Sequence, residues 1–61
     1  MFNILVTETS KNHAGKPFAG LVNLDGAVAG FLDEDHAYAF IEAESNVSFF
    51  AEFASVEVVP A

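Results

Sequence analysis

The first apolar run of the chain, from Phe2 to Glu8 (FNILVTE), is rich in large and β-branched side chains. Such short runs are typical of β-strands. Residues 9–17 then collect Thr, Ser, Lys, Asn, His, Gly and Pro, which is the composition of a connecting loop. Pro17 has no N–H to give to a neighbouring strand, so we place it at the first position of a second strand.

The strongest local pattern is LVNLDGAVAGFL, in which Asp25-Gly26 separates two apolar runs. A two-residue type I′ turn needs positive φ at both central positions, and Asp followed by Gly tolerates this well. The pattern therefore predicts a hairpin with the pairs Leu24–Ala27, Val22–Ala29, Gly20–Phe31, Asn23–Val28, Leu21–Gly30 and Ala19–Leu32. Both faces of this hairpin are apolar, so one face is available to a helix and the other requires a partner.

Residues 33–45 (DEDHAYAFIEAES) form the one convincing helical pattern. Asp33 is a good N-cap because its carboxylate can accept from free backbone N–H groups of the first turn. Ala37, Phe40 and Ile41 recur at helical spacing and predict the buried stripe. We expect Asn46 to end the helix in a left-handed conformation.

The last segment, SFFAEFASVEVV, is aromatic and β-branched and favours a strand over residues 48–59, with a bulge near Ala54 and Ser55. A helical turn over residues 48–54 is the alternative, since Phe49 and Phe53 are four residues apart. We therefore predict a single α+β domain over residues 1–61. Its order is β-β-β-α-β, with a small, mostly antiparallel sheet of three to four strands and one helix packed on it.

Charge adds a constraint on partners. The chain has 61 residues, no cysteine and a net charge of −7, and residues 21–61 carry eight of its nine acidic side chains and neither lysine. Such a surface repels phosphate, so we expect no direct binding to nucleic acid or membrane and predict a basic protein surface as the natural partner. No export signal is recognisable in MFNILV, and we expect a cytoplasmic protein.

Candidate catalytic chemistry is sparse. The stretch SKNHAGKP lacks the glycines and the following helix of a phosphate loop and reads as a solvated loop. In the run Asp33-Glu34-Asp35-His36, successive helical residues project about 100° apart, so the four side chains do not converge on one ion. No serine has a neighbouring histidine. We predict a non-enzymatic protein without cofactor or metal.

The predicted helix offers the best binding candidate. Glu34, Tyr38 and Glu42 fall in one row, with Asp35 beside them, and an aromatic side chain among charges is typical of a binding hot spot. The alternative is that Tyr38 only borders the core while the acids keep the protein soluble. The favoured hypothesis is an inhibitor in the style of the DNA mimics of phages and mobile elements, which would occupy a basic surface of a nucleic-acid-binding protein.

A second hypothesis is a structural or assembly protein. A chain of this length has few interior positions for the 52% of its residues that are apolar, and small domains without disulfides or metals commonly gain stability by oligomerisation. We predict a homodimer whose interface includes Leu21, Val28, Leu32 and Phe50. The third hypothesis, an enzyme accessory or small-ligand binder, would require a pocket within the oligomer.

Overall fold

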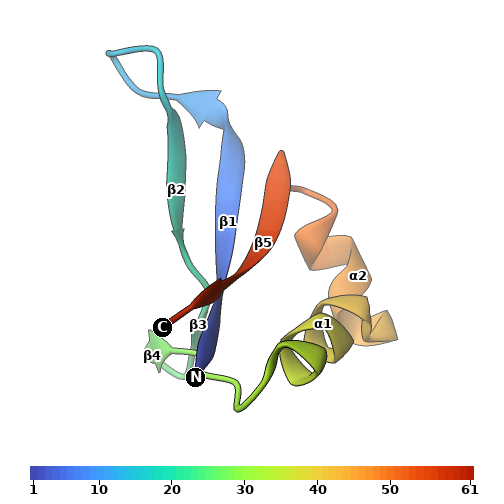
Figure 1. The fold of residues 1–61 in the computed structure, drawn as a ribbon. Helices are drawn as coiled ribbons and strands as arrows, with labels where there is room; N and C mark the ends of the chain where they lie inside the picture. The colour runs from blue at the N-terminus through green and yellow to red at the C-terminus, as the bar shows by residue number, and fades with distance from the viewer.

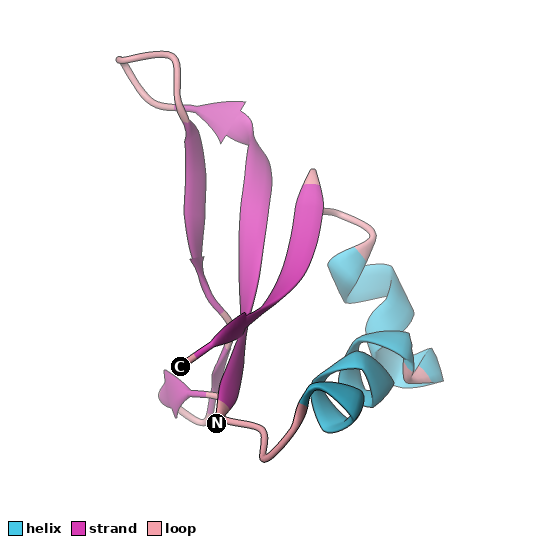
Figure 2. Ribbon diagram, viewed as in Figure 1, coloured by secondary structure: helices cyan, strands magenta, loops and turns pink.

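The computed structural model describes all residues, 1–61, and places a curved sheet beside two short helices (Figure 1). The α+β class is confirmed, with helices and strands segregated to different parts of the molecule (Figure 2). The elements in chain order are β1 (Phe2–Lys11), β2 (Pro17–Leu21), β3 (Asn23–Leu24), β4 (Ala27–Val28), α1 (Glu34–Glu42), α2 (Glu44–Phe50) and β5 (Ser55–Pro60).

The main sheet is antiparallel and has the order β2-β1-β5, so the first strand of the chain lies at its centre. On one side of β1, Leu5 pairs with Leu21 and Val6 with Gly20. On the other side β1 pairs with β5 from Phe2–Pro60 to Thr7–Ser55. The first part of β1 therefore has a neighbouring strand on each side, which explains why it contributes Ile4, the largest fully buried side chain of the protein.

The Asp25-Gly26 turn is confirmed, because both residues have positive φ, 52° and 82° respectively. The first pairs of the predicted register, Leu24–Ala27 and Asn23–Val28, are also confirmed. The next predicted pair, Val22–Ala29, is joined by one hydrogen bond from the Ala29 N–H to the Val22 carbonyl at 2.9 Å. The arms beyond this pair are wrong: residues 17–21 pair with β1, and Phe31 bridges Phe2 at the start of β1. The ten-residue strand β1 gives both segments a longer partner than they could give each other.

Replacing Gly26 with valine is expected to lower the free energy of unfolding by about 1 kcal/mol or more, because a β-branched residue resists the φ of 82° found there. Urea unfolding measures the loss. Gly20→Val is the matched control, since position 20 is in a strand, has no positive φ and has open space where a Cβ would lie. Equal stability of the two variants would contradict the turn.

The helical region differs from the single helix predicted over residues 33–45. Asp33 is the N-cap as expected, and its side chain accepts from the backbone N–H of His36 at 2.9 Å. The first helix ends at Glu42, because Ala43 is extended with ψ of 133°, and a second helix runs from Glu44 to Phe50. The predicted strand over residues 48–54 is wrong, and the helical alternative holds to Phe50. Glu44 thus opens a new helix, where a negative charge suits the positive end of the helix dipole.

The core lies between the helices and one face of the sheet. Ile4 and Val6 of β1 face Val58 and Val56 of β5, and α1 packs against both strands. The buried stripe predicted for the helix is confirmed by Ala37, which is fully buried, with Phe40 and Ile41 packed around the core. Only six residues are buried, namely Ile4, Val6, Val22, Ala29, Ala37 and Phe50. The helices therefore protect a small core, and much apolar surface stays exposed.

Candidate functional site

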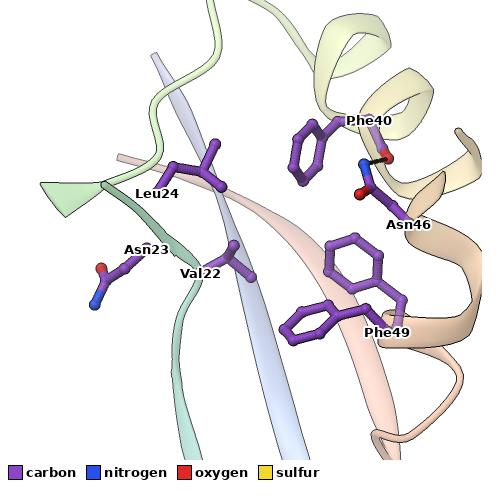
Figure 3. A pocket seen from close by; sticks show the side chains of 7 residues that line it. Val22, Asn23, Leu24, Phe40, Asn46 and Phe49 are labelled. Carbon is purple, nitrogen blue, oxygen red and sulfur yellow. Dashed lines mark hydrogen bonds between the residues drawn. The ribbon is translucent and has the colours of Figure 1, made fainter. Parts of the chain in front are cut away.

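An apolar groove opens between the end of β2 and the helical layer. It has a volume of about 290 Å³ and is lined by Val22, Asn23, Leu24, Phe40, Asn46, Phe49 and Phe50. Figure 3 shows Val22 and Leu24 on the strand side, facing Phe40, Asn46 and Phe49 on the helix side. The groove exists because α1 packs on β1 and β5 and leaves Leu24, in the neighbouring segment, 47% exposed.

The helical wall of the groove is held in place by one polar contact and by ring packing. The Asn46 side chain donates from Nδ2 to the backbone carbonyl of Phe40 at 2.9 Å, a bond drawn in Figure 3. This bond satisfies a carbonyl near the end of α1, where helix carbonyls lack partners, and it ties α2 to α1 across the break at Ala43. Asn46 therefore joins the two helices, in contrast to its predicted role as a left-handed helix end.

A chain of phenylalanine rings continues from the core to the rim of the groove. Phe50 contacts both Phe40, with ring centroids 6.0 Å apart, and Phe49, with ring centroids 5.1 Å apart. Phe50 is 6% exposed whereas the adjacent Phe49 is 49% exposed. The groove thus has a buried aromatic floor and an exposed aromatic rim, an arrangement suited to an apolar side chain from outside.

The residues predicted to bind a partner all lie on α1. Glu34, Asp35 and Glu42 are exposed, and Tyr38 is 49% exposed. Helical spacing puts residues 34, 38 and 42 in one row. No carboxylate of the protein forms an ion pair with a lysine, and the one contact of a carboxylate with a basic side chain joins His36 Nδ1 and Asp33 at 3.9 Å. The negative charge of this helix is therefore not neutralised within the molecule.

Both lysines lie at the other end of the molecule, at the tip of the hairpin formed by β1 and β2 (Figure 1). The loop between these strands is organised by Asn12, whose Oδ1 accepts from the N–H groups of Ala14 at 2.9 Å and Lys16 at 3.1 Å. The N–H groups of Ala14 and Lys16 therefore donate to a side chain of the loop itself. The positive and negative groups of the protein are consequently separated along its length.

The residues predicted for an oligomer interface fall into two groups. Leu21, Val28 and Leu32 are exposed, whereas Phe50 is 6% exposed and is part of the buried core. Leu21 and Leu32 do not belong to one hairpin as predicted, because Leu21 pairs with Leu5 of β1. Of the two adjacent rings, Phe49 is the one that reaches solvent, and the sequence pattern had not separated it from Phe50.

No three acidic or histidine side chains converge to form a metal-binding group, and none of the helices has the length and apolar character to cross a bilayer. The groove itself was missed by sequence analysis, since its lining comes from three segments that are distant in the chain. Comparison with protein families, with curated proteins and with solved structures found no match.

Proposed function

We propose that the protein is a non-enzymatic binding module whose acidic α1 face occupies a basic surface of another protein inside the cell. The observation that supports this most directly is that Glu34, Asp35 and Glu42 are all exposed without an internal ion pair. Carboxylates that have no internal partner are free to attract a positively charged surface. In its most specific form, the proposal is that these carboxylates imitate the phosphates of a nucleic acid.

Tyr38 gives this surface an apolar anchor. It lies half-exposed on the same helix as the three acids, and Tyr is enriched among residues that dominate binding energy when a rim of polar groups excludes water around them. The acids then steer the encounter and the Tyr38 ring contributes contact area. With this division of roles, the association rate constant depends more strongly on salt than the dissociation rate constant.

The test changes Glu34, Asp35 and Glu42 to glutamine together. Binding to the basic protein recovered with the wild-type chain is expected to weaken about tenfold or more at low salt, and the remaining binding is expected to depend less on salt. Surface plasmon resonance at several salt concentrations measures both quantities. The matched control changes Lys11 and Lys16 to alanine, and we expect an effect within about threefold because exposed charges contribute little singly.

Competition with nucleic acid distinguishes mimicry from simple charge attraction. If the proposal holds, the recovered partner binds nucleic acid, and this protein displaces the nucleic acid while the triple glutamine variant does not. Binding that is unchanged in the triple variant at every salt concentration would show that the acidic face takes no part in binding.

A second candidate function, assembly into a homo-oligomer, is favoured by the balance of buried and exposed apolar groups. Nine large apolar side chains are exposed, against six buried residues in all. Leu21, Val28 and Leu32 are among the exposed nine. Apolar area of this size is often covered by another chain in small domains.

A further inference from the structure

The two outer edges of the main sheet differ in how they are protected against further strand pairing. Strand β5, at one edge, carries the charged Glu57 in its middle and Pro60 at its end. Strand β2, at the other edge, has the sequence PFAGL, carries no charge, and is exposed at all five positions. Proteins commonly protect sheet edges with charge, proline or a covering segment. Beyond Pro17, β2 has none of these.

The hydrogen-bond pattern identifies which main-chain groups of β2 face outward. The N–H of Val22 donates to the carbonyl of Ile4 at 2.9 Å, so this pair belongs to the hydrogen-bonded class of the antiparallel ladder. Hydrogen-bonded and non-hydrogen-bonded pairs alternate along such a ladder. The main-chain groups of Gly20 therefore face β1, and those of Ala19 and Leu21 face outward from the sheet.

We propose that β2 pairs with β2 of a second copy of this chain, antiparallel and across a two-fold axis at Gly20. In this register Ala19 lies opposite Leu21 of the second copy, and the outward N–H and C=O groups of both residues find partners without requiring the missing N–H of Pro17. The two sheets become one continuous sheet with the order β5-β1-β2-β2-β1-β5. The interface is an edge of the sheet and not one of its faces, and it does not depend on the acidic face of α1.

The same register provides a side chain that can fill the apolar groove. Gly20 pairs with Val6, so Phe18 and Val22, two residues away on either side along the strand, share the face of the sheet that carries the helices. Pairing about Gly20 places Phe18 of the second copy opposite Val22, which lines the groove. Phe18 is 48% exposed in the single chain. Its ring is the occupant that this arrangement supplies, and each copy fills the groove of the other.

Charge also suits the pairing. Continued beyond the paired residues, this register puts Lys16 of one copy opposite Leu24 of the other, next to Asp25, whose charge has the opposite sign. The acidic helix α1 packs on β1 and β5, and in the view of Figure 1 both helices are drawn on the other side of these two strands from β2. Two chains with a net charge of −7 each can therefore pair while their most negative surfaces stay apart. Added salt is expected to tighten the pairing by screening the remaining repulsion.

Ala19→Pro tests the edge directly. The Ala19 N–H faces outward, so proline removes no hydrogen bond of the single chain but removes two bonds of the symmetric pair. Sedimentation equilibrium is expected to show a species of two 6.5 kDa chains for the wild type and a dimer weakened about thirtyfold or more for Ala19→Pro. Circular dichroism at a concentration where both are monomeric checks that the fold is kept.

A second variant and a site-resolved measurement keep the test decisive if Ala19→Pro fails to fold. Phe18→Ser is expected to weaken the dimer about tenfold or more. Val47→Ser, which removes an equally exposed apolar group from α2, is expected to change it less than about twofold. Amide hydrogen exchange at Ala19 and Leu21 is expected to slow as the protein concentration rises, while exchange at Gly20 is slow throughout.

Three results would overturn the proposal. One is a wild-type monomer at all concentrations with fast exchange at Ala19 and Leu21. Another is a dimer of undiminished affinity in a folded Ala19→Pro variant, which would place the contact elsewhere. The third is the finding that the β2 edge pairs with a strand of an unrelated protein and not with a second copy of this chain. The triple glutamine variant of α1 separates this proposal from the acidic-face function, because it should lose partner binding and still dimerise.

Discussion

Replacing Phe50 with alanine is expected to unfold most of the protein in dilute buffer. Phe50 is 6% exposed and contacts Phe40 and Phe49, so the substitution removes a buried ring and leaves a cavity between the helices and the sheet. Such changes cost about 3–5 kcal/mol. A single hydrophobic core in a domain below 70 residues rarely supplies more than about 3–5 kcal/mol in total. The loss is therefore comparable to the whole stability, and far-ultraviolet circular dichroism and urea unfolding would show it.

The adjacent Phe49 provides a matched control for this result. Phe49→Ala removes the same side chain from the neighbouring position, but Phe49 is 49% exposed on the rim of the groove. We expect a loss of about 1 kcal/mol and a folded protein. If Phe49→Ala and Phe50→Ala are equally stable, Phe50 does not occupy the core and its original prediction as an interface residue must be considered again.

Replacing Ile4 with alanine is expected to have a similarly large effect, for a different reason. Ile4 is the one large side chain that is completely buried, at 0% exposure, and it lies on the central strand opposite Val58 of β5. Loss of its side chain costs about 2–5 kcal/mol and weakens the contact between the sheet and the helices at its centre. Thermal unfolding followed by circular dichroism is expected to show a much lower Tm or no cooperative transition.

Ile4→Val separates packing from strand propensity in this experiment. Valine keeps the β-branched shape and removes one methylene group, so the expected loss is about 0.5–1.5 kcal/mol. Graded losses from isoleucine through valine to alanine would identify buried volume as the cause. An Ile4→Ala variant as stable as the wild type would mean that β1 is not the central strand.

Local features of the fold were predictable because neighbouring residues determine them. The Asp25-Gly26 turn depends on the φ preferences of two residues, and the start of α1 depends on the Asp33 side chain and the N–H of His36. Both were predicted correctly. The position of Pro17 at the start of β2 follows from its missing N–H and was also correct.

Long-range choices were not predictable from the same patterns. Residues 17–21 could pair with the segment after the turn or with β1. The local sequence does not show which of these two pairings is the more stable. The break at Ala43 has no glycine or proline to mark it. It is supported by Asn46, whose bond to Phe40 forms only when the two helices already lie together. The groove depends on both of these choices, so it could not be derived without the structure.

The position of β1 at the centre of the sheet has a consequence for the order in which the fold is assembled. Its pairing with β2 closes a short loop, whereas its pairing with β5 joins Phe2 to Pro60 across nearly the whole chain. The entropy lost on closing a loop increases with the number of residues enclosed. We therefore expect the β1–β2 hairpin to form early and β5 to dock late, together with the helices. Until that late step, Ile4 and Val6 have no cross-strand partner in β5, so the hydrophobic core of this protein is completed only when the two most distant strands meet.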